Sequence, residues 1–345
     1  MEYTAEEKGL LWLCACTDTD YRRRVSLTRA YDPACFLERF PSDEEFAAPA
    51  ARKRAVETLI AELDKKGYFA VTYASDDYPE RLVHIPEPPL VLYCAGNRAL
   101  LKRRKFAIVG SRKLQSWAQV LGRTVAEALS EHFVIVTGLA EGGDSAAIAG
   151  AIQSGNLICV LPNGLDECYP ASHLSLKERV RKAGLLVSEY LPNDRGKAHY
   201  FYARNRIIAG LSEGVLVTAA AERSGALITA NYAVDYSRDV FAFPYNPGSV
   251  QGAGCNNLIK KGAYLACGAE DILSSYGIKP QERREIPLSA QEEKVLAALR
   301  EGGQLHAAIL AERTGLKVFE ISAVLSGLEL KGLAVKAGGN KYSAI

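Results

Sequence analysis

The chain has 345 residues, a length that accommodates two or three domains. Hydrophobic residues make up 48% of it, which argues against global disorder, and no apolar run approaches the length of a membrane span. The net charge of +2 neither requires nor excludes nucleic acid, so any basic binding surface has to be local.

The cellular compartment follows from the N-terminus and the cysteines. Acidic residues near the start, without a long apolar segment, argue against a signal peptide. The eight cysteines form no CxxC pair, and several lie inside apolar runs, which favours free thiols in a reducing cytosol over a disulfide or metal framework. We therefore expect a cytoplasmic protein with no membrane association, cofactor or bound metal.

Residues 1–70 are expected to form a small helical N-terminal domain. Asp32 and Pro33 suit a helix cap followed by a proline at the first helical position, and one apolar face continues at helical spacing up to Gly67. The arginines at 22–24 are more simply explained as a solvated corner than as phosphate contacts.

Residues 71–105 are predicted to be a connector. Four prolines exclude helix over most of this segment, although a short strand is expected at 90–93. The basic run 102–105 is best explained as a solvated loop before the first strand of the main domain.

Strands and helices are expected to alternate from residue 106 to about residue 276. Short apolar runs that end in glycine turns are typical of buried parallel strands, and the segments between them can hold crossover helices. With the connector, residues 71–280 are therefore predicted to form a doubly wound, mostly parallel α/β sheet. Its seven expected strands lie at 106–109, 134–136, 157–161, 185–187, 215–217, 240–243 and 263–265.

The first two of these strands both end in glycine turns. Gly110-Ser111-Arg112 follows the first strand, and the stretch from Gly138 to Asp144 follows the second. The carboxyl ends of parallel strands form a ligand crevice, and free N–H groups at helix starts suit phosphates. Arg112 adds a fixed charge and a forked donor, so a phosphate-bearing ligand is expected here.

Two side chains are candidate N-caps of the helices that follow these turns. They are Ser116 and Asp144. As a cap, Asp144 would not contact the ligand, and this is the simpler interpretation of that residue.

Residues 286–345 are predicted to form a winged-helix-like domain after a polar linker at about 277–288. Ser289 and Glu292 suit a capping box, three helical segments follow, and residues 338–340 suit a hairpin turn. DNA reading by the third helix is one hypothesis. Because that helix has lysines only at its two ends, a weak or protein-facing role is favoured.

Several clusters of polar and aromatic residues are expected to converge on the carboxyl edge of the sheet. Their cations, hydroxyls and amides suit phosphate and sugar, and their rings suit stacking with unpaired bases. Arg204 and Arg206 have a structural alternative, pairing with carbonyls at the sheet edge, and Phe201 has one as a core residue. The candidate DNA-binding residues are Gly110, Ser111, Arg112, Gly138, Lys197, His199, Phe201, Arg204, Asn205, Arg206, Ser224, Gly225, Thr229, Asn256 and Lys260.

A catalytic set is not evident. The sequence has no HExxH, no GxSxG, no Walker A lysine, and no GxGxxG after the first strand. Lone acids such as Asp166, Glu167 and Glu189 are usually caps or surface residues. We therefore expect a protein that is not an enzyme and has no catalytic residues.

Six motifs, in order, closely resemble the DprA/Smf (DNA processing protein A) family. They are FAIVGSR, GLAEGGDSAAIAGA, GLDECYP, FYARNRIIAGLS, RSGALITA and GCNNLIKKGA. With the lead-in YPERLVHIPEPPLVLYCAGN, the resemblance extends from about residue 78 to residue 271. It implies an extended Rossmann-like sheet, flanked by a helical, SAM-like N-terminal domain and a winged-helix C-terminal domain.

The resemblance also implies a function. Members of this family bind single-stranded DNA and load the RecA recombinase onto it in natural transformation and recombination. They are not known for catalytic activity, and they form homodimers through the Rossmann-like domain. By motif, Arg112 is the expected phosphate contact and Phe201 the expected base platform.

Four positions depart from the family pattern. Ala198 stands where a basic residue is common, with Lys197 one residue earlier as a candidate substitute. Tyr202 stands where a proline is common, Ile148 where a histidine is common, and Ala226 where a serine is common.

Two other functions compete with this one. An enzyme acting on nucleotides, similar to the phosphoribohydrolases of cytokinin activation, would carry a PGGxGT segment followed by a glutamate. The equivalent region here, residues 223–227, lacks that glutamate. A transcription regulator would need tight duplex binding by residues 289–345 alone. The scarcity of cations on the third helix argues against such binding.

Overall fold

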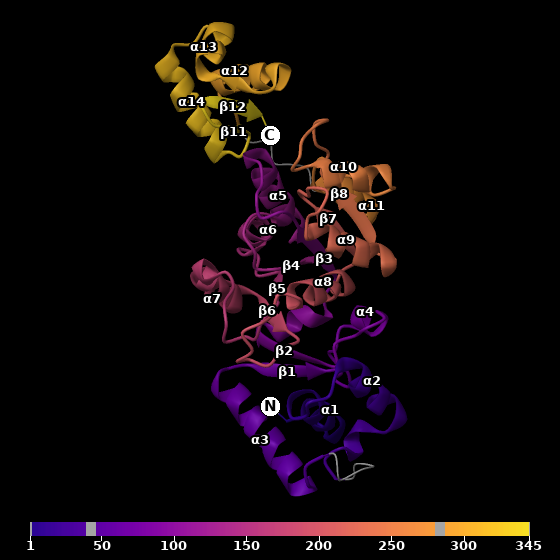
Figure 1. Ribbon diagram of the computed structural model, residues 1–345. Helices are drawn as coiled ribbons and strands as arrows, with labels where there is room; N and C mark the ends of the chain where they lie inside the picture. The colour runs from indigo at the N-terminus through magenta and orange to yellow at the C-terminus, as the bar shows by residue number, and fades with distance from the viewer. Residues whose placement is uncertain (1, 39–45, 280–286, 345) are drawn as a thin grey trace.

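The computed structural model describes residues 2–38, 46–279 and 287–344. Figure 1 shows three parts: helices of the N-terminal segment at the bottom, a sheet flanked by helices in the middle, and a small helical unit at the top. The predicted linker at 277–288 lies largely outside the described residues.

The middle part is a nine-stranded sheet in the described residues. β2 is antiparallel to both of its neighbours, whereas all the other neighbouring strands are parallel. All seven predicted strands belong to it, which confirms the mostly parallel α/β class. In spatial order the strands are β1 (Phe69–Thr72), β2 (Val91–Gly96), β6 (Leu185–Ser188), β5 (Leu157–Leu161), β4 (Val134–Thr137), β3 (Lys105–Val109), β7 (Gly214–Val217), β8 (Asp239–Ala242) and β9 (Tyr264–Leu265).

The order of the strands fixes the position of a ligand crevice. From β3 the chain moves outward through β4, β5 and β6, and then returns to place β7 on the other side of β3. The direction of winding therefore reverses at β3, and the carboxyl ends of β3, β4 and β7 surround this switch point.

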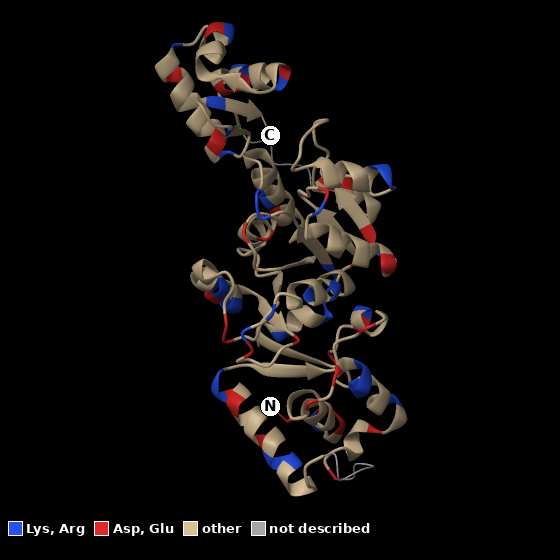
Figure 2. Ribbon diagram, in the orientation of Figure 1, with Lys and Arg blue, Asp and Glu red and all other residues tan. Residues whose placement is uncertain are grey.

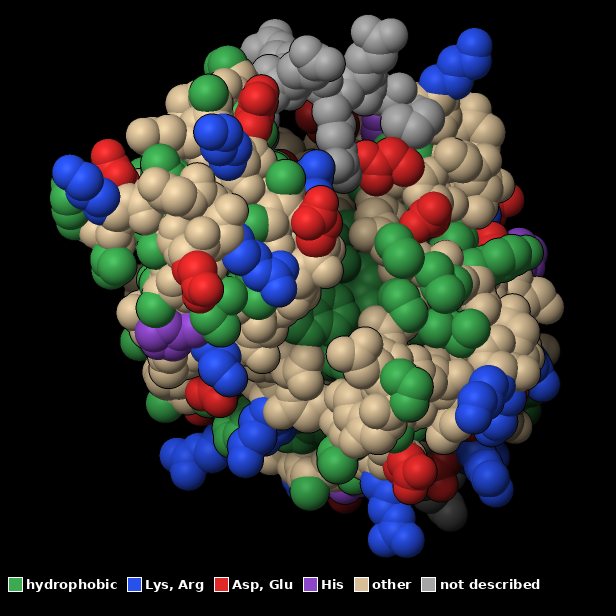
Figure 3. Space-filling view, turned by 90° about the horizontal axis from the view of Figure 1, so that it is seen from above, with side chains coloured by type: hydrophobic (Ala, Val, Ile, Leu, Met, Phe, Trp, Pro, Cys, Tyr) green, Lys and Arg blue, Asp and Glu red, His purple; other side chains and the backbone are tan. Residues whose placement is uncertain are grey.

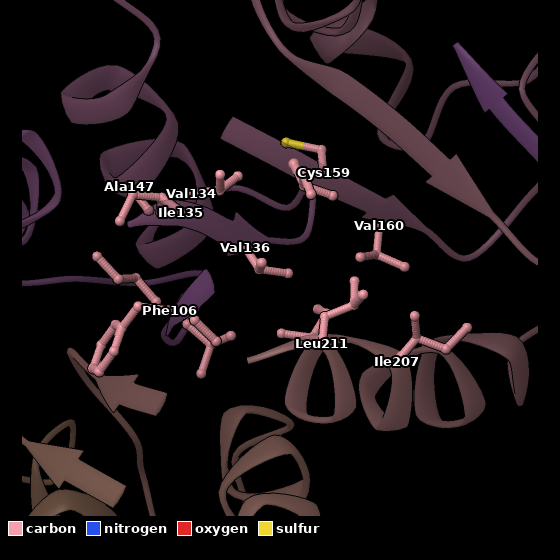
Figure 4. Packing of buried hydrophobic residues seen from close by; sticks show 14 of the residues in the cluster. Phe106, Val134, Ile135, Val136, Ala147, Cys159, Val160, Ile207 and Leu211 are labelled. Carbon is pink, nitrogen blue, oxygen red and sulfur yellow. The ribbon is translucent and has the colours of Figure 1, made fainter. Parts of the chain in front are cut away.

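Helices cover both faces of the sheet, and the strands between them are buried. Phe106 of β3 is fully buried and packs against Phe133 and Phe241, with ring centroids 5.8 Å apart in both pairs. Figure 4 shows how side chains of the strands meet those of the covering helices around Phe106. The helices are α4 (Glu80–Val83), α5 (Ser116–Leu129), α6 (Gly143–Ala151), α7 (Leu174–Ala183), α8 (Tyr200–Leu211), α9 (Ala226–Asp235), α10 (Ala253–Lys260) and α11 (Ala269–Ser275), with short 3-10 turns η2 (Arg98–Lys102) and η3 (Ala171–His173).

Both cap predictions in this domain are wrong. The N-cap of α5 is Gln115, and Ser116 is the first helical residue. The N-cap of α6 is Gly142, whose φ of 79° allows the chain to turn into the helix, and Asp144 lies inside the first turn. The Asp144 carboxylate therefore has a different role, described below.

The N-terminal helices pack directly on the sheet. The Ala70 N–H of β1 donates to the Tyr3 hydroxyl at 2.8 Å, and Leu63 joins the core of the sheet. Trp12 and Phe36 contribute instead to a separate small cluster between the helices. The elements are α1 (Ala5–Ala15), α2 (Tyr21–Ala30), η1 (Pro33–Cys35) and α3 (Pro49–Lys65).

The C-terminal unit has the predicted winged-helix layout. Ser289 and Glu292 form the expected capping box, and residues 338–340 connect the two strands of the hairpin. Its core is separate from that of the sheet. The elements are α12 (Ala290–Gly302), β10 (Leu305–His306), α13 (Ala307–Thr314), α14 (Val318–Leu330), β11 (Ala334–Lys336) and β12 (Lys341–Ala344).

All eight cysteines lie in the described part of the chain and are free thiols. None of the helices in the described ranges is both long and apolar enough to cross a bilayer.

Candidate nucleic-acid interface

A cavity of about 520 Å³ opens at the switch point of the sheet. It lies between the turn after β3, the N-terminal part of α8 and the start of α9. Nine of the fifteen predicted residues line it, and Ala140 and Asp144 line it as well, so residues from four separate stretches of the sequence do converge. The nine are Gly110, Ser111, Arg112, Phe201, Arg204, Asn205, Ser224, Gly225 and Thr229.

The glycine turns after β3 and β4 are packed tightly against one another. A Cβ on Gly110 would lie 2.2 Å from Thr218 Oγ1, and one on Gly142 would lie 2.2 Å from the Ser111 carbonyl oxygen. The Ser111 N–H donates to the Ala219 carbonyl at 2.8 Å, and the Gly143 N–H donates to that of Ser111. The first bond ties the turn after β3 to the chain after β7, and the second ties it to the turn after β4. Because both N–H groups are engaged in this way, side chains have to provide much of the anion binding.

Hydroxyl groups join two of the clusters at the floor of the cavity. Ser111 Oγ lies 3.1 Å from Ser224 Oγ, although 113 residues separate them in the sequence. Two hydroxyls at this distance can present both a donor and an acceptor to a ligand. Arg112 is exposed at the rim, where its guanidinium is free to meet a phosphate.

Phe201 shares the wall of the cavity with a ring that sequence reasoning missed. Tyr169 meets Phe201 edge to face, with centroids 5.1 Å apart, and the Arg112 guanidinium lies 5.8 Å from the Tyr169 centroid. Tyr169 is half exposed and also lines a smaller adjoining cavity of about 140 Å³. The motif GLDECYP, which contains Tyr169, was the available signal.

Arg204 is the buried cation of the site. It donates to the Val160 carbonyl at the end of β5 and, through Nε, to Asn205 Oδ1 at 3.1 Å. The structural alternative, a bond to a sheet-edge carbonyl, is therefore correct for Arg204, which nevertheless lines both cavities.

Asp144 faces Arg204 beneath the cavity. Burial raises the pKa of Asp144, and the positive charge of Arg204 partly offsets this rise. Burial also lowers the pKa of Arg204, and the negative charge of Asp144 partly offsets that fall. The Ala140 N–H also donates to the carboxylate at 3.2 Å. A Cβ on Gly138 would lie 2.3 Å from Asp144 Oδ2 and 2.7 Å from Arg204 Nη1, so Gly138 makes room for both groups.

Three predicted residues lie around the other side of α8. Arg206 forms a buried ion pair with Glu189 at 2.7 Å. Lys197 lies 5.9 Å from the centroid of Tyr200, and His199 contacts the same ring edge on. None of the three lines the cavity at the switch point, whereas Ala198 does.

The last two predicted residues belong to α10. The Asn256 side chain accepts a hydrogen bond from the Tyr245 N–H at 3.0 Å and donates one to the Tyr245 carbonyl at 2.9 Å. These two bonds hold the loop after β8 in place. Lys260 is at the end of the helix and does not line the cavity. Figure 2 shows Lys and Arg interspersed with acidic residues along the chain, so the site relies on local cations.

Family models match most of the chain. Residues 69–277 match DNA recombination-mediator protein A, and residues 279–340 match the DprA winged helix domain. The DNA processing protein DprA of Streptococcus pneumoniae is 38% identical over 246 residues, which cover 71% of this chain and 83% of that protein. Protein Smf of Synechocystis sp. is 34% identical over 330 residues, covering 82% of each chain.

Two solved structures are similar as well. The X-ray structure of DprA from Streptococcus pneumoniae aligns with a TM-score of 0.66 and 33% identity, covering 79% of this chain and 98% of that one. DNA processing protein A from Helicobacter pylori, studied for its single-stranded DNA binding mode, aligns with a TM-score of 0.55 and 29% identity over 61% of this chain and 95% of that one. The chain therefore belongs to the family of DNA recombination-mediator protein A.

Proposed function

We propose that this chain binds single-stranded DNA in the cavity at the switch point and acts as a recombination mediator. The observation that carries the proposal is the grouping of Arg112, Tyr169 and Phe201 at an open cavity. A guanidinium suits a phosphate, while rings accessible from a cavity suit an unstacked base. In a duplex the base faces are covered, so the preference should be for single strands.

The proposed activity includes loading of the RecA recombinase onto the bound strand. Family membership supports this step, and a strand held at one cavity would leave its remaining length free for a second protein. RecA-dependent ATP hydrolysis on the same strand, with and without this chain, tests it. Stimulation is the expected result.

We further propose a homodimer formed through the Rossmann-like domain. β9 is an edge strand of the sheet, and its two residues, Tyr264 and Leu265, are about half exposed. Edge strands with exposed apolar side chains favour pairing with another chain. The free thiols of all eight cysteines support a cytoplasmic location as part of the same proposal.

We propose no catalytic role and no cofactor for the cavity. Asp144, the carboxylate that lines it among the described residues, is buried opposite Arg204 and accepts the Ala140 N–H. These contacts suit a structural group that holds Arg204 in place. Incubation with AMP tests the nucleotide-processing alternative, and release of adenine would favour it.

The winged-helix unit is proposed to face a protein. The start of α14 exposes Val318 and Phe319, by 58% and 70%. Figure 3, which views the molecule from above the orientation of Figure 1, shows Lys and Arg interspersed with Asp and Glu on this face of the molecule. A surface of this kind lacks the one-sided positive field that suits duplex DNA.

The proposed function is tested by fluorescence anisotropy with a labelled single strand and a duplex of equal length. Tighter binding of the single strand, weakening steeply with salt, is expected. Equal binding to both forms would turn attention to nucleotides.

A further inference from the structure

A second cavity lies on the opposite side of α8 from the first. It has a volume of about 680 Å³ and is bounded by α1 and α2 of the N-terminal segment, by β2, and by the chain after β6. Helix α8 separates the two cavities, because Phe201, Arg204 and Asn205 face the first, whereas Tyr200 and Arg206 face the second.

Tyrosine rings dominate the wall of this second cavity. Tyr190 and Tyr200 are stacked in parallel, with centroids 3.8 Å apart and an interplanar angle of 4°. Tyr21 of α2 and Tyr93 of β2 also line it. Stacked rings at the side of a cavity form an extended apolar platform that suits another flat ring.

The hydroxyl of Tyr93 indicates that the second cavity binds a polar ligand. Tyr93 is 1% exposed, and its oxygen has no hydrogen-bond partner within the described ranges. A buried hydroxyl without a partner loses its hydrogen bonds to water and gains none in return, so such groups usually have a partner in the functional state. A polar ligand in the cavity that Tyr93 lines would supply one.

Two arginines give the cavity a positive side. Arg22 and Arg24 of α2 line it, and no carboxylate of the described residues lies within ion-pair distance of either. Arg24 donates to Thr19 Oγ1 at 3.3 Å, which orients its side chain. Both guanidiniums are therefore available to bind a phosphate.

The acids of the cavity are mostly engaged elsewhere. Glu189 pairs with Arg206, Asp20 accepts the Arg23 N–H as the cap of α2, and Asp194 accepts the Gly196 N–H. Glu87 remains exposed at the rim. Its carboxylate can accept an exocyclic amino group, as acidic side chains do from cytosine.

We propose that the second cavity is a nucleotide subsite, which takes a base against the tyrosine rings and a phosphate at Arg22 and Arg24. The inference rests on the proposed function, because the nucleotide is expected to belong to the strand held in the first cavity. The strand crosses the start of α8, where Lys197 is exposed beside Tyr200. A free nucleotide has the same chemistry and is the other source to be distinguished.

The placement of three predicted residues agrees with such a path. Lys197, His199 and Arg206 do not line the first cavity. Arg206 lines the second cavity, and Lys197 and His199 lie next to the ring of Tyr200, which also lines it. The basic residues near α8 would thus contact one strand that runs from the first cavity to the second.

The test measures affinity for oligo-dC of increasing length, over roughly 4 to 16 nucleotides. The variant is Arg22→Ala/Arg24→Ala, and Arg23→Ala serves as a control, because Arg23 is on the same helix but does not line the cavity. Wild type should gain affinity beyond a threshold length. The double variant should bind short strands normally and lose that gain, with a salt slope lower by roughly 0.7 for each lost phosphate contact.

Tyr93→Phe provides a second variant that keeps the shape of the core. If the hydroxyl binds the nucleotide, long strands should bind more weakly and short strands unchanged. Unaltered binding of long strands by both Tyr93→Phe and the double variant, together with no binding of dCMP that depends on Arg24, would overturn the proposal.

Competition by dCMP distinguishes the two sources. If dCMP removes the extra affinity of long strands and leaves the binding of short strands unchanged, the subsite also accepts free nucleotides. If dCMP binds in a manner that depends on Arg24 while strand length has no effect, the subsite belongs to the free nucleotide. Loss of short-strand binding in Phe201→Ala, measured in parallel, shows independently whether the first cavity holds the strand.

Discussion

The rings of Tyr169 and Phe201 meet edge to face, with centroids 5.1 Å apart, at the mouth of the cavity formed by the sheet's switch point. Tyr169 comes from the loop after β5, and Phe201 from the first turn of α8. Two rings held at this angle present one face and one edge to the same space, which suits a single inserted base.

Removal of either ring should weaken binding of single-stranded DNA. Phe201→Ala and Tyr169→Ala should each cost about 1–3 kcal/mol, or roughly 5- to 150-fold in Kd, because each removes a stacking surface. Phe319→Ala, which removes an exposed ring of the winged-helix unit, is the control and should bind as wild type. Wild-type affinity in Phe201→Ala would remove this residue from the site.

Arg112 should contribute through its shape as well as its charge. Arg112→Lys retains the charge but loses the forked donor and the contact with the Tyr169 ring, so affinity should fall while the salt slope stays the same. Arg112→Ala should lower that slope by roughly 0.7. The measurement is anisotropy over a range of salt concentrations, and an unchanged slope in Arg112→Ala would contradict a phosphate contact.

Gly138 should tolerate no side chain. Its Cβ would lie 2.3 Å from Asp144 Oδ2 and 2.7 Å from Arg204 Nη1, so Gly138→Ala should displace the buried pair and cost about 1–3 kcal/mol of stability. Binding should also weaken, because Arg204 lines the cavity.

Gly225→Ala is the matched control for this substitution. Gly225 lines the same cavity and has a helical φ of −59°, and a Cβ at this position would meet no atom within 4 Å. The free energy of unfolding of the Gly225→Ala variant should stay within about 0.5 kcal/mol of that of wild type. Thermal unfolding measures both variants, and equal stability of the two would refute the tight packing around Gly138.

Lys105 should make stability depend on alkaline pH. Burial lowers the pKa of Lys105 from 10.5 to about 8, and its ammonium donates to the Leu101 and Arg103 carbonyls. Between pH 8 and 10.5 the unfolded chain binds the proton that the folded chain has released, so the free energy of unfolding rises with pH through this window. The full shift corresponds to about 3 kcal/mol.

The measurement compares wild type with Lys105→Met by chemical denaturation across that pH range. The difference between the two should shift in favour of wild type as the pH rises, and other groups that titrate there cancel in the comparison. If the difference in the free energy of unfolding between the two proteins stayed constant with pH, the lowered pKa of Lys105 would be contradicted.

Leu265→Glu should weaken self-association. The substitution places a charge on the edge strand β9, where repulsion between two copies would oppose pairing. Leu174→Glu changes a similarly exposed leucine on α7 and is the control. Sedimentation velocity should show a monomer for the first variant only, and a dimer in both would place the interface elsewhere.

The sheet could be predicted from the sequence because its strands are short apolar runs that end in glycine. The local pattern also located Gly110, Ser111 and Arg112 at the crevice. It could not locate Tyr169, because the approach of that ring to Phe201 depends on the path of a loop that has no repeating pattern. In the same way, the contact that makes Asp144 a partner of Arg204 joins residues 60 positions apart.

The different roles of Arg204 and Arg206 have a simple geometric cause. Successive residues of an α-helix are about 100° apart, so residues two positions apart point in nearly opposite directions. Once α8 is known to run from Tyr200 to Leu211, the two arginines are expected on nearly opposite sides of the helix, and Arg204 lines the first cavity whereas Arg206 does not. The sequence motif grouped them because it shows proximity along the chain and not direction.

Fluorescence anisotropy of wild type and Arg112→Ala, with a labelled oligo-dT strand and a duplex of equal length, tests the central claim most directly. We predict that wild type prefers the single strand and that Arg112→Ala loses much of this preference while keeping its fold. Equal affinity of wild type for both forms, or an Arg112→Ala variant that binds the single strand as wild type does, would contradict the assignment of the cavity at the switch point as the DNA-binding site.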